Sequence, residues 1–386
     1  MSHRYAVLGA GRQGAAAAYG LGKFAEAEAV TLADVDERAA HVAAERVNTL
    51  VGRRFATGTR LDASDAVTTR TLLHGHHAAL SCVPYFLNED VARAAVAARV
   101  HFCDLGGNTG VVERELAMHP DALSRGISLI PDCGLAPGLG NTLAALAIEQ
   151  FDSDIDVHIR CGGLPVNPHP PLDYMLVFSI HGLLNEYTGE AEFLRDGRLV
   201  RVPTLTEDEK IDLGPLGVCE ASITSGGTST APRTFAGGKV RSYDYKTVRY
   251  AGHWSKIRTL LDLGLLDKAP VTIGPLSVRP RDVAAACLVP RLSFPGEKDL
   301  VVMRVWAEGV KNGTRSRVQY DLLEYTDDAT GFSAMERTTA FPAALVARMM
   351  AGGETMRGAI PLETSVPPGP FVDRLKGWGI PIRVTR

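Results

Sequence analysis

The feature that most limits the fold of this chain is the segment Tyr5–Ala18, where a short apolar run gives way to an alanine-rich stretch. Between them lie Gly9, Gly11 and Gly14, in the spacing G-x-G-x-x-G. In a strand–turn–helix unit, the first glycine allows the tight turn and the second lets the backbone approach a pyrophosphate. The third lets the helix pack closely on the strand, and the helix N-terminus then directs its N–H groups at the phosphates. The spacing therefore predicts a dinucleotide-binding turn.

The residues after this turn strengthen that prediction and address the choice of cofactor. A second apolar run, Ala29–Ala33, ends at Asp34, twenty positions after Gly14. A dinucleotide site places the carboxylate that binds the ribose 2′-OH at about this distance. The same carboxylate would repel the 2′-phosphate of NADP, and Arg38, one helical turn further on, is expected to point to solvent. We therefore predict NAD as the cofactor, with a chance glycine turn in another α/β fold as the alternative.

Over the first 140 residues, strand-like runs alternate with helical stretches. Hydrophobic periodicity predicts strands at 60–65, 77–83, 100–104 and 127–131 and helices at 37–50 and 89–98, with Asp65 and Asn88 as helix N-caps. This alternation is typical of a Rossmann-type, doubly wound parallel sheet in an α/β protein.

From about Asn141 the alternation stops, and the pattern predicts an α+β domain with a mostly antiparallel sheet. Residues 156–161 and 240–250 have strand character, and two long strands between residues 300 and 325 meet at Asn312-Gly313, which is typical of a type I′ turn. We assign residues 1–140 to a dinucleotide-binding domain and 141–334 to a substrate-binding and dimerisation domain. The segment 335–386, helical and then loop-rich, is expected to pack back on the nucleotide domain.

Composition excludes several classes of protein. A length of 386 residues indicates two domains, and a formal net charge of −3 argues against nucleic acid or an anionic membrane as a partner. No apolar span has bilayer length, and the first strand begins close to Met1, so we expect a cytoplasmic protein. The six cysteines form no C-x-x-C pair, and His74, His76 and His77 lie at the amino edge of the expected sheet. We therefore expect neither a disulfide framework nor a metal site.

Three loops, residues 81–85, 104–108 and 132–138, follow strands at the carboxyl edge of the sheet, where ligands bind in this architecture. Taken singly, each loop also fits a plain strand-to-helix turn. Together with the glycine turn, they define the residues expected to contact the cofactor, namely Gly9, Gly11, Arg12, Gln13, Gly14, Asp34, Ser81, Cys82, Val83, Pro84, Asp104, Leu105 and Gly106.

Over most of its length the sequence resembles the saccharopine dehydrogenase-like family, and within it the lysine 6-dehydrogenase branch. Besides the glycine turn, the resemblance is carried by four stretches, residues 131–138, 161–165 with 171–179, 224–230 and 244–253. The elements Gly-Gly-Leu-Pro and Arg-Tyr-x-Gly define the family, whereas Thr-Ser-Gly-Gly-Thr-Ser-Thr and Arg-Tyr-Ala-Gly-His favour the lysine branch.

The resemblance implies a homodimer that oxidises the ε-carbon of L-lysine with NAD. The product would be 2-aminoadipate 6-semialdehyde, which cyclises to 1-piperideine-6-carboxylate, with release of ammonia and NADH. A saccharopine reductase or dehydrogenase and a carboxynorspermidine dehydrogenase are alternatives in the same family. A non-catalytic NAD-sensing protein is the alternative of another class.

Oxidation of the ε-carbon requires a group that removes a proton from the ε-amine. This amine has a pKa of about 10.4, and it must be neutral before the ε-carbon can lose a hydride. Tyr85, Asp104 and His253 are the candidates for this role or for directing water. Each also has a structural alternative: a packing aromatic, a turn cap and a hydrogen-bonded histidine.

We expect an arginine to bind the α-carboxylate of lysine, because a guanidinium can bind a carboxylate with two hydrogen bonds. Arg249 is the first choice and Arg233 the second, although Arg249 could instead form a cross-strand ion pair. Thr228, Ser229 and Tyr174 are candidates for hydrogen bonds to the α-amino group.

Overall fold

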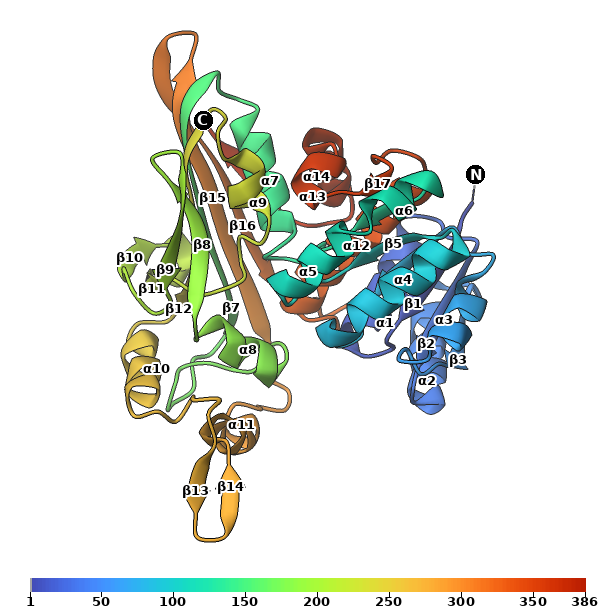
Figure 1. Cartoon of the computed structure of the whole chain (residues 1–386), viewed down its shortest axis with the longest axis horizontal. Helices are drawn as coiled ribbons and strands as arrows, with labels where there is room; N and C mark the ends of the chain where they lie inside the picture. The colour runs from blue at the N-terminus through green and yellow to red at the C-terminus, as the bar shows by residue number, and fades with distance from the viewer. Residues whose placement is uncertain (1) are drawn as a thin grey trace.

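The computed structural model describes residues 2–386 and contains two large sheets (Figure 1). The first has seven parallel strands in the order β17–β6–β5–β4–β1–β2–β3. Their bounds are β1 (Arg4–Leu8), β2 (Ala29–Asp34), β3 (Ala56–Arg60), β4 (Ala78–Ser81), β5 (His101–Asp104), β6 (Ser128–Ile130) and β17 (Gly358–Ala359). The predicted parallel sheet is confirmed. Its strand order reverses between β1 and β4, and such a reversal marks the place where dinucleotides bind.

Helices cover both faces of this sheet, as expected for a doubly wound fold. One face packs on α1 (Arg12–Lys23), α2 (Glu37–Val51) and α12 (Ala334–Ala351). The other packs on α3 (Ala66–Leu73), α4 (Asn88–Ala98) and α6 (His119–Ser124), with α5 (Thr109–Leu116) next to α4. Small residues permit this close packing: in α1, the residues from Gly14 to Gly22 are all buried.

Two local predictions in this domain are wrong. The third strand ends, rather than begins, at Arg60, because residues 56–60 pair with β2 and residues 61–65 form the turn that follows. Asp65 does cap α3, accepting hydrogen bonds from two backbone N–H groups of the first turn. Asn88, in contrast, is the first residue of α4 and makes no cap, since its side chain accepts a hydrogen bond from Ser81.

The second sheet is mixed, with the central order β10–β11–β12–β7–β15–β16–β18. Its strands are β7 (Ser153–Pro165), β8 (Glu190–Arg195), β9 (Arg198–Pro203), β10 (Glu209–Asp212), β11 (Val218–Ser222), β12 (Val240–Arg249), β15 (Asp299–Lys311), β16 (Thr314–Tyr325) and β18 (Ile382–Thr385). All pairs are antiparallel except β7 with β12. The predicted hairpin is present, with φ of 50° at Asn312 and 77° at Gly313. Val301, Met303 and Val305 form its buried face.

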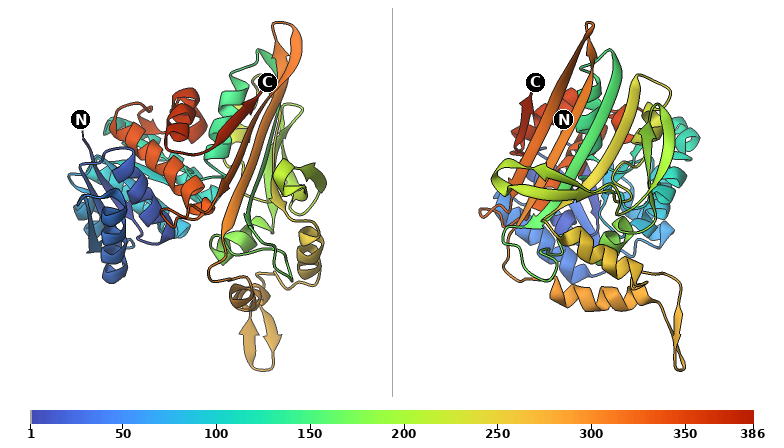
Figure 2. Two further views of the ribbon diagram at one scale, coloured as in Figure 1. Left: turned by 180° about the vertical axis from the view of Figure 1, so that it is seen from behind. Right: turned by 90° about the vertical axis from the view of Figure 1, so that its left-hand side faces the viewer.

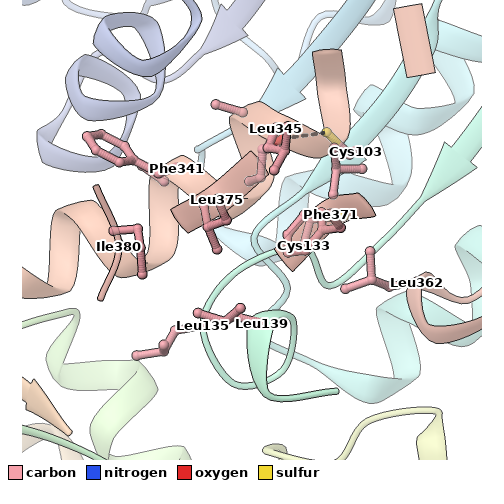
Figure 3. Packing of buried hydrophobic residues seen from close by; sticks show 14 of the residues in the cluster. Cys103, Cys133, Leu135, Leu139, Phe341, Leu345, Leu362, Phe371, Leu375 and Ile380 are labelled. Atoms are coloured by element: carbon pink, nitrogen blue, oxygen red, sulfur yellow. Dashed lines mark hydrogen bonds between the residues drawn. The ribbon is translucent and has the colours of Figure 1, made fainter. Parts of the chain in front are cut away.

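The two sheets are joined through a shared core (Figure 2). Here α7 (Leu139–Ile148) packs on the second sheet, and α13 (Leu362–Ser365) and α14 (Pro368–Gly377) pack on α7. Figure 3 shows side chains of α12, α14 and the loop before α7 converging there, among them Phe341, Leu375 and Leu135. The segment 335–386 is thus divided: α12 and β17 join the first sheet, whereas β18 pairs with β16.

The lower part of the molecule in Figure 1 holds α8 (Ile180–Glu186), α10 (His253–Asp262), α11 (Pro280–Arg291) and the separate hairpin of β13 (Val271–Ile273) and β14 (Leu276–Val278). The short helix α9 (Ala231–Phe235) lies higher, near α7, and contacts β8 and β12. Within residues 2–386, no helix is both long and apolar enough to cross a membrane.

Candidate functional site

The glycine turn between β1 and α1 has the geometry that its spacing predicts. Gly9 has a φ of 92°, and a Cβ there would lie 2.7 Å from the carbonyl oxygen of Cys82. A Cβ on Gly14 would collide with the carbonyl oxygen of Gly9, so α1 approaches the turn as only glycine allows. Gly11 faces open space, with no atom within 4 Å of a Cβ placed on it. The turn thus leaves room for a diphosphate at the start of α1.

Asp34 lies at the carboxyl end of β2, beside this turn. Its Oδ2 accepts a hydrogen bond from Ala10 N–H at 2.7 Å, and its Oδ1 accepts one from Asp36 N–H at 3.0 Å. The carboxylate therefore stands next to the glycine turn, where the ribose of a dinucleotide is expected. The side chain of Arg12 turns away from it and forms an ion pair with Glu336 of α12.

A cavity of about 790 Å³ lies between the carboxyl edge of the first sheet and the second sheet. Six of the predicted cofactor residues line this cavity: Gln13, Cys82, Val83, Pro84, Leu105 and Gly106. Tyr85, predicted as a catalytic residue, lines it too. Ser81 and Asp104 do not line it. Ser81 donates a hydrogen bond to Asn88, and Asp104 is fully buried behind the loop, where its Oδ1 accepts hydrogen bonds from Gly106 and Asp132 N–H.

The opposite wall of the cavity carries a buried pair of opposite charges. Arg249, at the end of β12, is 2% exposed and lies 3.5 Å from Glu186 of α8, measured from Nη2 to Oε2. The guanidinium also lies 4.6 Å from the centre of the Tyr174 ring, and its Nε has no hydrogen-bond partner. Burial raises the pKa of Glu186 to about 7, although Arg249 acts in the opposite direction. Both side chains line the cavity, so an incoming ligand can contact both.

A second arginine lines the same cavity. Arg281 of α11 donates hydrogen bonds to Asn185 Oδ1 at 2.6 Å and to the carbonyl oxygen of His181 at 3.1 Å. Its Nη1 is buried without a partner. Lys268, Arg279 and Asp282 also belong to the lining, and Arg279 is paired with Asp282 at 2.7 Å. This end of the cavity therefore carries an excess of positive charge.

A neighbouring cavity of about 560 Å³ shares Gly107, Pro137 and Glu186 with the first. It contains three of the predicted substrate residues: Thr228, Ser229 and Arg233. Thr228 donates a hydrogen bond to the carbonyl oxygen of Glu192, and Arg233 forms ion pairs with Glu192 and Glu113. Arg233 is therefore less available to a substrate carboxylate than Arg249.

The structure places two further predicted residues away from both cavities. Tyr174 is completely buried and contacts Arg249 with its ring. His253 is also completely buried at the start of α10, with its ring nitrogens hydrogen-bonded to Tyr187 and to the carbonyl oxygen of Leu172. Burial, together with Arg249 nearby, lowers the pKa of His253 to about 3. Of the three proton acceptors predicted from the sequence, only Tyr85 lines a cavity.

Three residues of the site were missed by sequence reasoning: Glu186, Arg281 and Asp132. Glu186 lies beside Asn185 in a helix with no catalytic motif, and Arg281 belongs to a segment that gave no clear pattern. Asp132 was visible as part of a carboxyl-edge loop, and its φ of 61° with its burial now distinguishes it. Within residues 2–386, no group of three or more His, Cys, Asp or Glu side chains is arranged to hold a metal ion.

Comparison with known families agrees with this arrangement. Residues 5–130 match the family described as the saccharopine dehydrogenase NADP binding domain, and residues 134–380 match the saccharopine dehydrogenase C-terminal domain. The chain belongs to the saccharopine dehydrogenase family. The first part of this saccharopine dehydrogenase family protein is thus an NAD(P)-binding domain.

Among curated relatives, the chain is 25% identical over 382 residues to the mitochondrial alpha-aminoadipic semialdehyde synthase of Mus musculus, covering 81% of this chain and 41% of that protein. It is 26% identical over 220 residues to the saccharopine dehydrogenase [NADP(+), L-glutamate-forming] of Schizosaccharomyces pombe, covering 54% and 47%. The chain therefore matches less than half the length of each of these relatives.

Two solved structures share the fold of this family member. Apo saccharopine dehydrogenase (L-Glu forming) from Saccharomyces cerevisiae superposes with a TM-score of 0.77 at 18% identity, over 100% of this chain and 99% of that one. The homospermidine synthase of Legionella pneumophila, in complex with NAD, gives a TM-score of 0.66 at 10% identity, over 100% and 91%.

Proposed function

We propose that the protein is an NAD-dependent dehydrogenase that oxidises the ε-carbon of L-lysine and releases the ε-amine as ammonia. The observation that carries the proposal is the pair of Arg249 and Glu186 on the cavity wall opposite the loops at Cys82–Pro84 and Leu105–Gly106. Those loops follow β4 and β5, where the nicotinamide of a bound dinucleotide is expected.

The pair matches the head of a free α-amino acid. An α-carboxylate and an α-ammonium are attached to one carbon, so their partners must also be neighbours of opposite charge. Arg249 supplies the guanidinium for the carboxylate, and Glu186, 3.5 Å away, supplies an acceptor for the ammonium. The aliphatic chain would then extend across the cavity, which places the ε-carbon toward the nicotinamide loops.

The rest of the cavity suits the chemistry of the ε-amine. Leu135, Phe178 and Met335 line it, and poorly solvated surroundings favour the neutral amine over its cation. When bound, NAD would accept the hydride from the ε-carbon. The resulting iminium would add water and lose ammonia, leaving 2-aminoadipate 6-semialdehyde, which cyclises to 1-piperideine-6-carboxylate.

NAD rather than NADP is supported by the position of Asp34. Its carboxylate lies beside Ala10 in the glycine turn and would accept a hydrogen bond from the ribose 2′-OH while repelling a 2′-phosphate. The fit of the three glycines to their roles supports a dinucleotide at this turn.

The test is a panel of amines with NAD and NADP in parallel. L-lysine, ornithine, diaminobutyrate and saccharopine are each incubated with the protein, and NADH or NADPH is followed by absorbance. We expect the highest kcat/KM with L-lysine and NAD. Turnover of saccharopine without turnover of lysine would contradict the substrate, and preference for NADP would contradict the cofactor.

A second candidate, saccharopine as the substrate, is favoured by the cationic end of the cavity. Saccharopine carries three carboxylates, and Arg281 and Lys268 line the cavity in addition to Arg249, whereas Arg279 is already paired with Asp282. The free Nη1 of Arg281 is the specific observation in its favour. Arg281→Ala separates the two candidates, because it would weaken saccharopine oxidation strongly and lysine oxidation little.

Two further parts of the proposal concern the protein in the cell. We expect a homodimer, which light scattering on the purified protein would test, and a cytoplasmic location, which fractionation of the source cells would test. A monomer at working concentration, or recovery with a membrane or secreted fraction, would contradict these expectations.

A further inference from the structure

Three carboxyl groups meet behind the loops at the carboxyl edge of the first sheet. Asp104 ends β5, Asp132 follows β6, and Glu115 lies in the last turn of α5. Asp104 and Glu115 are 0% exposed, Asp132 is 5% exposed, and Asp132 alone of the three lines a cavity. Asp104 binds the backbone N–H of Asp132 at 3.2 Å, and Glu115 contacts the carboxyl of Asp104.

This cluster lacks the partners that buried acids usually have. Oδ2 of Asp104 and both carboxyl oxygens of Glu115 are buried without a hydrogen-bond partner, apart from each other. Buried carboxylates are normally hydrogen-bonded or paired with a cation, so two carboxylates in this position must share a proton. Burial and the neighbouring Asp104 raise the pKa of Glu115 to about 11. The pair of Asp104 and Glu115 therefore holds one proton and one negative charge.

Asp132 faces that negative charge on one side and a cavity on the other. Its Oδ2 accepts a hydrogen bond from Ser229, and its Oδ1 packs against Gly106 so closely that a Cβ there would collide with it. Gly106 belongs to the loop that also lines the larger cavity. The carboxyl thus lies at the boundary between the nicotinamide loops and the second cavity.

The groups around these carboxyls are acids and thiols rather than cations. Asp132 faces Asp104, Ser229 and Glu363 of α13, and the thiol of Cys133 lies beside it. Glu115 faces Asp104, Asp132 and Glu89 of α4, of which Glu89 is already paired with Arg93 and Arg114. Burial and the charge of Asp104 raise the pKa of Asp132 to about 8, and only the hydrogen bond from Ser229 acts in the opposite direction.

We propose that Asp132 is the acid–base group of the cleft, and that Asp104 and Glu115 are positioning residues that tune it. The proposal rests on the proposed function, because amine oxidation is the reaction that needs such a group. Asp132 takes a proton from the ε-ammonium, directly or through a water molecule, and releases it to solvent through the second cavity. The balance is R–CH2–NH3⁺ + NAD⁺ + H2O → R–CHO + NH4⁺ + NADH + H⁺, and the last proton is the one that Asp132 carries.

Position supports this assignment over the acceptors expected from the sequence. The two cavities share Leu105 and Gly107 of the nicotinamide loop, and Asp132 packs against Gly106 between them, so an ε-amine held at that loop lies where the cavity of Asp132 begins. His253 lines neither cavity and has both nitrogens engaged. Asp104 is separated from the cavities by its own loop, and it acts through Asp132.

Two substitutions that move the pH dependence in opposite directions test the proposal. Asp104→Asn keeps the acceptor for Gly106 and Asp132 N–H but removes the negative charge, so the ascending limb of kcat against pH should move down by about one pH unit. Ser229→Ala removes the hydrogen bond to Asp132, so the same limb should move up. Asp132→Asn should lower kcat by about 100-fold or more, within the range of general acid–base catalysis. Glu45→Gln, an exposed change on α2, is the control and should leave the profile unchanged.

A titration that needs no activity keeps this proposal separate from the choice of substrate. In protein labelled with ¹³C at the aspartate carboxyl, one resonance should titrate near pH 8, disappear in Asp132→Asn and move down in Asp104→Asn. Absence of such a resonance would overturn the proposal, as would an unchanged kcat profile in both Asp104→Asn and Ser229→Ala. If the resonance behaves as expected but lysine is not oxidised, the proposed function fails and not the tuned carboxyl.

Discussion

The two walls of the cleft are built in different ways. The wall from the first sheet is made largely of the loops that follow its strands, residues 82–86 and 105–107, and the glycine turn with Asp34 lies beside it, all within the first 110 residues. The wall from the second sheet is made of side chains, with Glu186 on α8, Arg249 on β12 and Arg281 on α11, and these come from distant parts of the chain. A cofactor common to many enzymes can be held by local backbone geometry, whereas a particular substrate needs charges that only the folded chain brings together.

The largest expected effect lies in the side-chain wall. Arg249→Ala should lower kcat/KM for L-lysine about 30- to 4,000-fold, which corresponds to a loss of roughly 2–5 kcal/mol of transition-state binding. The reason is that the substitution removes a buried charged partner of the substrate and leaves Glu186 unpaired. The measurement is steady-state kinetics with lysine at saturating NAD.

Arg241→Ala is the matched control for this prediction. Arg241 lies in the same strand, but it is exposed and pairs only with Asp156 at 3.5 Å. We expect near-normal kinetics from it. An unchanged apparent affinity for lysine in Arg249→Ala would show that the head group binds elsewhere.

On the side of the first sheet, substitution of Asp34 should weaken binding of the cofactor and leave binding of lysine unchanged. Asp34→Ala should raise the Kd of NAD by about 10- to 100-fold, the worth of a hydrogen bond to a charged group, and should improve binding of NADP relative to NAD. Isothermal titration with both dinucleotides measures this.

Asp34→Asn separates the two roles of this residue. It retains an oxygen for Ala10 N–H but carries no charge, so it should preserve the turn and still relax the selection against NADP. Equal NAD affinity in Asp34→Ala and the native protein would contradict the assignment of the ribose site.

The contrast between the walls also explains what the sequence could predict. Gly9, Gly14 and Asp34 act within one strand–helix–strand unit, so spacing alone located them, and the hairpin at Asn312-Gly313 is equally local. The contact of Glu186 with Arg249 joins residues 63 positions apart in separate elements, and no periodicity reveals it. For Arg249, the sequence gives only one signal, which is its place in a segment that resembles a family.

His253 and Asp104 show the opposite error, since the sequence predicts them as proton acceptors and the structure encloses them. Both residue types are suited to proton transfer; Asp104 ends a strand at the carboxyl edge of the first sheet, and His253 follows a strand of the second sheet. Both side chains are completely buried and cannot contact a ligand directly: His253 is hydrogen-bonded to Tyr187 and Leu172, and Asp104 faces inward. Exposure to a cavity is a property of packing, which the sequence does not specify residue by residue.

An effect of intermediate size is expected on the free energy of unfolding, through the buried carboxyl of Glu115. Because the pKa of Glu115 is raised to about 11 in the folded protein, the folded state retains a proton that the unfolded chain loses above its ordinary pKa of about 4.3. Stability from this group is fully present below pH of about 4.3 and is lost progressively as pH rises above that value. Chemical denaturation at pH 5, 7 and 9 should therefore show Glu115→Gln gaining stability relative to the native protein as pH rises. A constant difference would mean that Glu115 is not protonated in the folded state.

The smallest expected effect is at Tyr85, which lines the cavity from the nicotinamide side. If its ring packs against the loop at Gly107 and its hydroxyl makes one ordinary hydrogen bond, Tyr85→Phe should lower kcat by only about 2- to 10-fold. Single-turnover kinetics with lysine would check this. A loss of 1,000-fold or more would identify Tyr85, rather than Asp132, as the main proton acceptor.

The most direct test of the central claim follows the hydrogen itself. L-lysine deuterated at the ε-carbon is incubated with the protein and NAD, and the dinucleotide and amino acid products are examined by mass spectrometry. We predict NADH that carries one deuterium, with ammonia and 1-piperideine-6-carboxylate formed in equal amounts. Unlabelled NADH, or deuterium retained in full by the lysine, would contradict oxidation at the ε-carbon.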